Sequence, residues 1–247
     1  MHKILRNINI IAFIFIFGGC AIYKQTEPIS PVFLDGAVRK SKIDRVPFQH
    51  AWSSSNSGRG INSIYVKPVR IDLLSPDSWT DSTSMGITSA DDYNEVVEKL
   101  AQYFNERLIE ELRLVYKRKK RLKIVDAPND KSVILEIAIT EMILSRPVSH
   151  AIGLTVPVPG IGMALSAMHD PHVAFAARFV APDGKTLLGT LADRRFAPAR
   201  LIDLNKLTMT STIREIISQW AREIAEAIEF ERLAKVERSS RFSLLPW

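Results

Sequence analysis

Apolar residues after residue 60 fall into two long stripes with the period of a helix. Between Tyr93 and Val115 they recur every three or four positions, which puts them on one face of a helix of about seven turns. A second stripe of the same period runs from Ile213 to Ile228. Ser89, followed closely by two aspartates, predicts the start of the first helix, because serine caps helix ends and acidic side chains stabilise the first turn. The pattern therefore predicts two long helices, each with one buried face.

Five shorter runs alternate apolar and polar residues, with the period of two that is typical of a half-buried strand. They cover residues 62–71, 122–125, 133–141, 172–181 and 186–196. In the third run four apolar residues share one face, namely Val133, Leu135, Ile137 and Ile139. Pro68 places the first run at a sheet edge or a bulge, because proline has no N–H to donate to a neighbouring strand. The sequence Pro-Asp-Gly-Lys after Ala181 predicts a hairpin between the last two runs.

The order of these elements is strand, long helix, short strand, long strand, hairpin and long helix. Two helices with one apolar face each can cover one side of a sheet, so the sequence predicts an α/β fold of the α+β type. We expect a two-layer sandwich in which a mixed sheet of about five strands is covered by the two long helices. A length of 247 residues with 46% hydrophobic and 24% charged residues suits one domain of this kind.

The first twenty residues have the three parts of a bacterial export signal. Lys3 and Arg6 form a basic head, residues 8–17 are apolar apart from one asparagine, and two glycines precede Cys20. The apolar run has about half of the roughly 20 residues that a transmembrane helix needs. The alternative is an uncleaved signal anchor that leaves Cys20 as a free thiol. Cys20 is the only cysteine, which excludes an internal disulfide and a thiolate metal cluster.

Residues Phe17-Gly18-Gly19-Cys20 resemble the lipobox, the processing site of bacterial lipoproteins. The resemblance implies that a signal peptidase recognises Phe17, Gly18 and Gly19, and that Cys20 becomes an acylated N-terminus with a diacylglycerol on its sulfur. Several acyl chains, such as palmitate, give stable anchoring. Ala21 stands where an aspartate would retain such a protein at the inner membrane. We therefore expect a lipid anchor in the bacterial outer membrane and a domain that faces the periplasm.

This interpretation divides the chain into a cleaved signal peptide, a lipidated N-terminus with a flexible linker, a globular α/β domain and a C-terminal tail, at residues 1–19, 20–60, 61–237 and 238–247 respectively. Within the linker, prolines and a Ser-Ser-Ser-Asn-Ser-Gly stretch interrupt any periodicity. Phe33, Leu34 and Phe48 are nevertheless apolar residues that can pack onto the domain.

The same order of elements behind a lipobox resembles the bacterial lipoprotein family called domain of unknown function 3313. The features that match are Phe33-Leu34-Asp35, the run from Ile64 to Val69, Tyr103-Phe104, the hairpin from Pro182 to Leu188, Asp193-Arg194-Arg195 and Trp220-Ala221. The family carries no assigned catalytic residues. The resemblance therefore implies a location and a fold type, but no reaction.

Catalytic signatures are missing, since the sequence lacks HExxH, GxSxG, a Walker loop and GxGxxG. His169 and His172, with His150 upstream, are the most metal-like residues, and a hydrolase or metal enzyme would need them to meet an acidic side chain in a cleft. A proline bends the chain between His169 and His172, so structural roles are favoured. The acidic pair Asp91–Asp92 fits a helix start, and Glu110–Glu111 fit the solvated side or the edge of the first apolar stripe. We expect no catalytic residue, no cofactor and no metal.

A nearly uncharged segment, residues 147–168, separates the third and fourth strand runs. Connections of this length are uncommon in compact domains and are often functional. Exposed, its apolar residues would suit a protein partner or a lipid surface. Alternatively, they fold back over the uncovered sheet face and complete the core. The candidate contacts are Ile152, Leu154, Val156, Val158, Ile161, Met163 and Leu165.

A basic run ends the first helix, formed by Lys117, Arg118, Lys119, Lys120 and Arg121. Cations at a helix C-terminus complement the helix dipole, and this is the favoured explanation. The alternative is a contact with anionic lipid headgroups or acidic glycans near the membrane. The overall net charge of +6 is too small to indicate nucleic-acid binding.

Together these features favour a non-enzymatic, membrane-tethered periplasmic lipoprotein that acts as a binding or scaffold module in the cell envelope. Its partners would be the membrane, through the lipid anchor, and an envelope protein that the sequence does not name. The alternative is a carrier or sensor of an apolar ligand such as a lipid, with residues 147–168 as a lid.

Overall fold

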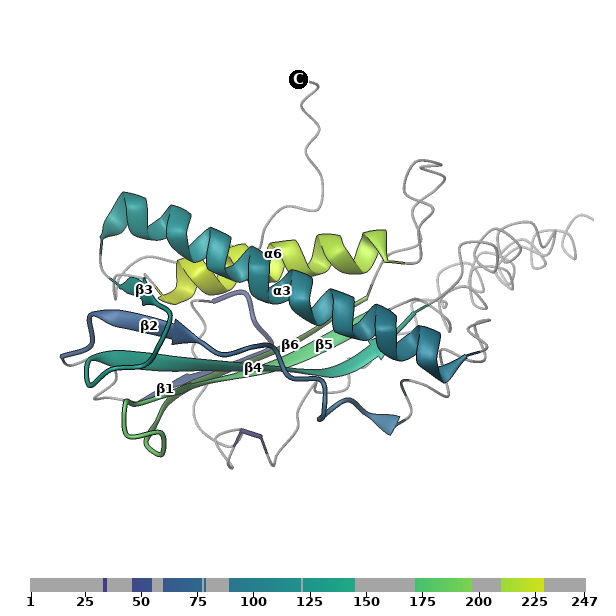
Figure 1. Ribbon diagram of the computed structural model, residues 1–247, viewed down its shortest axis with the longest axis horizontal. Coiled ribbons are helices and arrows are strands. Elements are labelled where there is room, and N and C mark those ends of the chain that lie inside the picture. The colour runs from purple at the N-terminus through teal and green to yellow at the C-terminus, as the bar shows by residue number, and fades with distance from the viewer. Residues whose placement is uncertain are drawn as a thin grey trace, which may run out of the picture.

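The computed structural model describes residues 33–34, 46–54, 60–76, 78, 89–120, 122–144, 172–196 and 210–228. In these ranges six strands form one sheet, and two helices lie on one of its faces (Figure 1). In chain order the elements are β1 (His50–Ser53), β2 (Ser63–Val66), α3 (Ala90–Lys119), β3 (Lys123–Val125), β4 (Ser132–Ile143), β5 (His172–Val180), β6 (Leu187–Phe196) and α6 (Ser211–Ile228).

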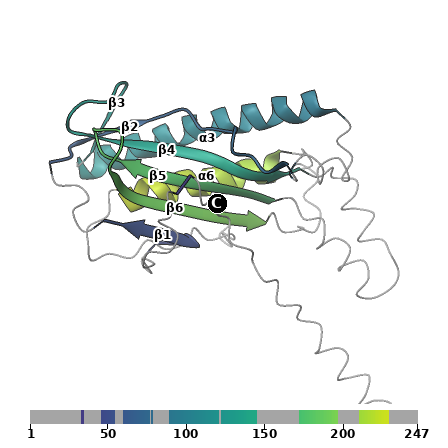
Figure 2. The ribbon, with the colours of Figure 1, turned by 90° about the horizontal axis from the view of Figure 1, so that it is seen from below.

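The strands lie in the order β1-β6-β5-β4-β2-β3. Strand β2 is parallel to both of its neighbours, and the remaining pairs are antiparallel, so the sheet is mixed as predicted. Figure 2 views the sheet from below, with β1 at one edge and the helices behind the strands. The α+β class and the two covering helices are confirmed. The sheet has six strands where about five were expected.

The additional strand, β1, lies within the range that was predicted to be a flexible linker. Its four residues pair antiparallel with β6, from His50 opposite Ala192 to Ser53 opposite Gly189. The folded part of the chain therefore begins before residue 61. Of the two positions predicted from Pro68, the sheet edge is wrong, because β2 lies between β4 and β3. The bulge fits: Val66 pairs with Leu135 and Arg70 with Ala138, so one extra residue lies on the side of the proline.

Helix α3 begins and ends where its sequence dictates. The Ser89 side chain accepts a hydrogen bond from the backbone N–H of Asp92 at 3.3 Å, and Asp91 and Asp92 occupy the first turn. These contacts satisfy orphan N–H groups and complement the positive end of the helix dipole. At the other end Lys120 adopts the left-handed conformation with φ of 54°, and its N–H donates to the Tyr116 carbonyl at 2.8 Å. The predicted apolar stripe is buried against the sheet.

The main core lies between the helices and the sheet face beneath them. The four apolar residues of β4 predicted to share a face all belong to it. At its centre Trp220 of α6 packs against Phe175 of β5, with ring centroids 4.7 Å apart, and against Phe104 of α3 at 6.2 Å. Such aromatic contacts contribute about 0.5–1.5 kcal/mol beyond the area that they bury. One aromatic cluster therefore joins both helices to the sheet.

The predicted hairpin joins β5 to β6. Gly184 has a φ of 69°, a conformation that glycine adopts without strain. The Asp183 carboxylate accepts hydrogen bonds from the backbone N–H groups of Lys185 and Thr186, each at 2.8 Å. Neither of the described helices has an apolar stretch long enough to cross a bilayer.

Candidate functional site

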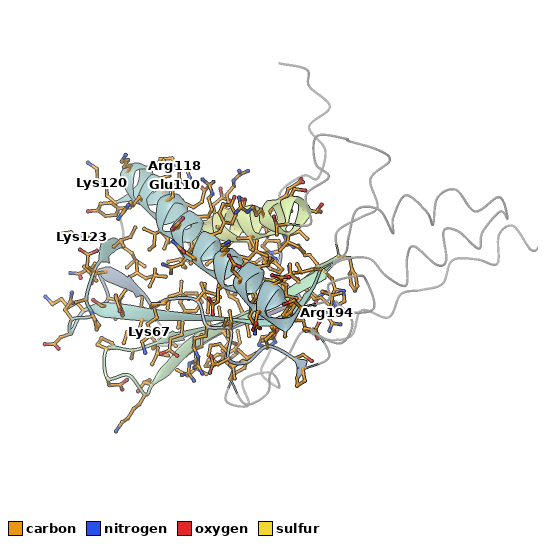
Figure 3. The ribbon with its side chains drawn as sticks, turned by 45° about the vertical axis from the view of Figure 1, so that its right-hand side comes forward. Lys67, Glu110, Arg118, Lys120, Lys123 and Arg194 are labelled. Carbon is orange, nitrogen blue, oxygen red and sulfur yellow. The ribbon has the colours of Figure 1, made fainter. Side chains whose placement is uncertain are left out.

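The predicted basic run forms one exposed end of the molecule. Lys117 and Arg118 lie in the last turn of α3, Lys120 ends the helix, and Lys123 opens the edge strand β3. All four side chains are exposed. Figure 3 shows Arg118, Lys120 and Lys123 together where α3 ends. The side chain of Lys119 and the whole of Arg121 lie outside the described residues.

An exposed leucine accompanies these cations. Leu114 is 45% exposed and is the one large hydrophobic side chain that stands out to solvent among the described residues. It precedes Lys117 by three positions and Arg118 by four, so the three residues are neighbours on the helix surface. We call Leu114, Lys117, Arg118, Lys120 and Lys123 the basic end.

The acidic residues that precede this end, Glu110 and Glu111, are already engaged, whereas Asp126, three residues after Lys123, is exposed. Arg107 binds the carboxylates of Glu110 and, at 2.8 Å, Glu111. Over the described ranges, no carboxylate forms a salt bridge with the four cations of the basic end. The pairing by Arg107 also accounts for the Glu110–Glu111 pair, and Asp91–Asp92 occupy the start of α3 as expected.

The sheet face opposite the helices, here called the outer face, binds a piece of the N-terminal segment. Phe33 and Leu34 are 3% and 0% exposed and pack on Ala138, Ala176 and Ala192. These alanines lie directly opposite one another on β4, β5 and β6. Three small side chains in register leave a shallow path across the strands for a bulky dipeptide. Phe33-Leu34 was assigned to the linker, but its apolar residues were expected to be able to pack onto the domain, and the structure confirms that they do.

Cations flank the Phe33 ring. The guanidinium carbons of Arg178 and Arg70 lie 4.8 Å and 5.7 Å from its centroid, within the range of cation–π attraction. Arg178 also binds Glu136 at 2.5 Å, and Lys67 binds the other oxygen of Glu136 at 2.5 Å. On the outer face, ion-paired side chains therefore surround the apolar contact made by Phe33.

The ion pairs of Glu136 with Lys67 and Arg178 make part of the stability of the fold depend on pH. Burial raises the pKa of the Glu136 carboxyl, but hydrogen bonds from Lys67 and Arg178 outweigh burial and hold the pKa below its ordinary 4.5. A carboxyl whose pKa is depressed by folding stabilises the fold above its unfolded pKa, and this contribution is lost as pH falls through the folded value. We expect the urea midpoint to fall below about pH 4.5, and to fall less in Glu136→Gln. An equal acid dependence in the two proteins would contradict this assignment.

Docking of Phe33 also predicts a stability effect. Phe33→Ala removes a buried aromatic side chain and should lower the free energy of unfolding by about 2 kcal/mol. Leu114→Ala removes an exposed apolar side chain and serves as the matched control, with an expected change within about 0.5 kcal/mol. Urea unfolding followed by tryptophan fluorescence measures both. A Phe33→Ala protein as stable as the control would show that the contact contributes nothing.

A buried ionic cluster lies on the other side of the sheet, beneath α6. Asp193, Arg195 and Glu223 are 0%, 2% and 0% exposed. Arg195 donates through Nε to Asp193 Oδ2 at 2.8 Å and through Nη2 to Glu223 Oε2. Trp220 Nε1 donates to the same Asp193 oxygen at 2.9 Å, and Gln49 N donates to Oδ1 at 3.3 Å. The cluster thus connects β6, α6 and the residue before β1.

The sequence analysis did not predict that these residues bind one another. Asp193-Arg194-Arg195 and Trp220-Ala221 had been noted only as separate features of the family resemblance. One signal was available in the spacing of β6. Asp193 and Arg195 follow Leu191 at intervals of two residues, so all three lie on the strand face that is directed at the core. A second was Glu223, which lies on the apolar stripe of α6 three residues after Trp220. The cluster is fully covered by protein, which suits a structural role.

His172 is the one metal-ligand candidate that can be placed. Its Nε2 lies 3.6 Å from Glu141 Oε2, and its ring lies 4.9 Å from the ring of Phe196. Glu141 also binds Arg194. His150 and His169 lie outside the described residues. Within the ranges that the structure describes, no group of three histidine, cysteine or acidic side chains is arranged to hold a metal ion.

The remaining predicted positions lie outside the described residues as well. They are Phe17, Gly18, Gly19 and Cys20 at the lipobox, and Ile152, Leu154, Val156, Val158, Ile161, Met163 and Leu165 in the apolar segment. That segment connects paired strand ends, since Ile143 of β4 lies opposite His172 of β5.

A family model described as "Protein of unknown function (DUF3313)" matches residues 50–224. The chain belongs to this family. The match begins at the first residue of β1 and ends within α6, so it includes the whole sheet, helix α3 and most of α6 of this DUF3313 protein. Phe33 and Leu34 lie before the matched range. No curated protein matches the chain significantly.

Several solved structures are similar to this DUF3313 protein at low identity. Two structures of the PelC dodecamer from Paraburkholderia phytofirmans match with TM-scores of 0.37 and 0.36 at 10% identity, each over 71% of this chain and 95% and 96% of theirs. The hypothetical protein CT253 from Chlamydia trachomatis matches with a TM-score of 0.34 at 11% identity, over 68% of this chain and 96% of its own.

Proposed function

We propose that this DUF3313 protein is a lipoprotein of the bacterial envelope, anchored through Cys20 and acting as a non-enzymatic binding module on the periplasmic side of the outer membrane. The observation that carries the proposal is the segment that ends in the chain's sole cysteine, with its basic head, short apolar run and two glycines. Cleavage before Cys20 would leave the acylated residue as the new N-terminus.

The docked dipeptide Phe33-Leu34 supports a short connection between anchor and domain. Thirteen peptide steps separate Cys20 from Phe33, which span at most about 45 Å when fully extended. A linker that was free up to residue 60 would have about three times this reach. With Phe33-Leu34 bound to the outer face, the domain stays close to the membrane that holds the lipid.

Intact mass and membrane fractionation test the anchor. We expect the wild-type protein to lack residues 1–19, to carry the mass of a diacylglycerol and a further acyl chain, and to fractionate with the outer membrane. Cys20→Ser should retain residues 1–19 and carry no lipid. Ala21→Asp is a matched control that should keep the lipid but move the protein to the inner membrane. A wild-type protein with the mass of the unmodified chain would refute the proposal.

The partner contact is proposed for the apolar segment 147–168. It is long, almost uncharged and rich in glycine and proline, and it links two strands that are already paired. Deleting it should weaken the recovery of envelope proteins with the tagged protein and leave α3, α6 and the sheet folded, as judged by circular dichroism. An unchanged set of recovered proteins would count against this contact. A lipid-sized adduct in native mass spectra would instead favour the carrier or sensor function.

A further inference from the structure

Charge is segregated along α3. Residues 91–98 contain four acidic residues and no basic one, whereas residues 113–123 contain seven basic residues and no acidic one. A helix of thirty residues is about 45 Å long. This separation is several times the Debye length of about 8 Å at physiological ionic strength. The two ends therefore interact independently with a charged surface, and only the basic end is attracted to a negative one.

The helix dipole explains only part of the basic end. Its effect falls off within the last turn, which includes Lys117 and Arg118. Lys123 belongs to β3, beyond the helix, and opens the edge strand of the sheet. Leu114 is uncharged, so the dipole gives no reason for its exposure. A surface that is both anionic and partly apolar accounts for all of these residues together.

We propose that the basic end rests on the anionic phospholipid headgroups of the membrane into which the lipid anchor inserts. This inference rests on the proposed lipid anchor and names the surface that the domain touches. Lys117, Arg118, Lys120 and Lys123 contact phosphate groups, while Leu114 enters the boundary between headgroups and acyl chains. An acidic glycan would satisfy the cations, but it offers no hydrocarbon for Leu114.

The connection from Cys20 to Phe33, which ends on the outer face, is compatible with this orientation. Phe33-Leu34 packs on Ala138, six residues along β4 from Ser132, a distance of about 20 Å. Ser132 and Lys123 both pair with Ser63, so they lie two strands apart at the same end of the sheet. The connection from Cys20 to Phe33, up to about 45 Å long, is longer than either separation. The anchor and the basic end can therefore reach one membrane surface at the same time.

Vesicle sedimentation tests the contact independently of acylation. The probe is the chain from residue 20 onward with Cys20→Ser, mixed with vesicles of phosphatidylcholine alone or of three parts phosphatidylcholine to one part phosphatidylglycerol. We expect binding only to vesicles with phosphatidylglycerol, and loss of binding in about 1 M salt, where the Debye length is about 3 Å.

Substitutions separate the basic end from overall charge. Lys117→Gln with Arg118→Gln should lower the partition coefficient about 30-fold, since each cation near an anionic surface contributes about fivefold. Lys99→Gln with Arg222→Gln removes the same charge from exposed positions outside the basic end, and binding should stay within about twofold. Leu114→Gln keeps every cation and should still weaken binding about tenfold. Circular dichroism and urea midpoints verify that all variants fold.

Three outcomes would overturn the inference. They are equal losses in the two double variants, equal binding to both kinds of vesicle, and binding to soluble polygalacturonate without binding to vesicles. The last outcome would identify an acidic glycan as the ligand. Failure of the anchor is a different result, because wild-type protein without lipid refutes the proposed function even when the vesicle assay succeeds.

Discussion

Arg195→Met is expected to lower the free energy of unfolding by about 3–5 kcal/mol, because it removes the cation between two buried carboxylates. Asp193 keeps its hydrogen bond from Trp220, but Glu223 loses both bonds that Arg195 donates. Desolvated carboxylates that lose their cation cost far more than exposed ones. Urea unfolding at pH 7 measures the loss.

Arg222→Met is the matched control, because Arg222 lies on the exposed side of α6, and its effect should be within about 0.5 kcal/mol. The double variant Arg195→Met with Glu223→Met should recover part of the loss, since it removes one buried carboxylate together with the cation that it binds. If the single variant is as stable as the control, the buried ion pairs do not hold α6 on the sheet.

Trp220→Ala is the second substitution with a large expected effect. It opens a cavity between Phe104 and Phe175 and also withdraws the N–H that binds Asp193, so we expect a loss of about 3–5 kcal/mol. Trp220→Phe keeps a ring in the core but lacks the donor, and should cost about 1–3 kcal/mol for the lost hydrogen bond.

Thermal and urea unfolding of the two Trp220 variants give both numbers. Since Trp220 is one of four tryptophans, the transitions are best followed by far-ultraviolet circular dichroism. A Phe variant as destabilised as the Ala variant would mean that the hydrogen bond, and not the packing, dominates at this position.

The helices and five of the strands could be predicted because each carries its own periodic pattern. The stripe of α3 and the alternation of β4 each extend over several periods. Burial follows the stripe of α3, whereas β4 is buried on both faces, because Phe33-Leu34 also covers part of the outer face. Strand β1 could not be found in this way. Four residues, His-Ala-Trp-Ser, are too few to establish an alternation, and the pairing depends on Gly189–Ala192 far along the chain.

Pro68 correctly indicated an irregularity in the strand, but the alternative of a sheet edge was wrong for a local reason. Proline lacks an N–H, and this fact was applied to the whole run from 62 to 71. The regular strand ends at Val66, but pairing with β4 resumes at Arg70, whose N–H donates to the Ile137 carbonyl at 2.9 Å. The proline therefore lies in a short irregular stretch, while β2 itself has parallel partners on both sides. Where a strand ends within an apolar run depends on its neighbours, which local sequence does not encode.

Of the surface features and buried contacts, some were visible in the sequence and others required the structure. The cations of the basic end were visible as a run, but the exposure of Leu114 follows from its position off the buried stripe and required the packing of α3 to be known. The ion pair of Arg195 with Glu223 joins β6 to α6. A charged residue in a strand does not show by itself which distant residue it will bind. The alanine path for Phe33-Leu34 depends on the register of three strands.

The docking of the N-terminal segment also sets an order of events during synthesis. In the export that we propose, the N-terminus crosses first, so Phe33-Leu34 and β1 would emerge well before the strands that receive them. β1 pairs only with β6, and Phe33-Leu34 packs on alanines of β4, β5 and β6. Neither contact can form until residue 192 and its neighbours have crossed. Under the proposed anchoring, Phe33-Leu34 is therefore not yet held on the sheet when the cleaving and acylating enzymes meet Cys20, and completion of the sheet then shortens the tether.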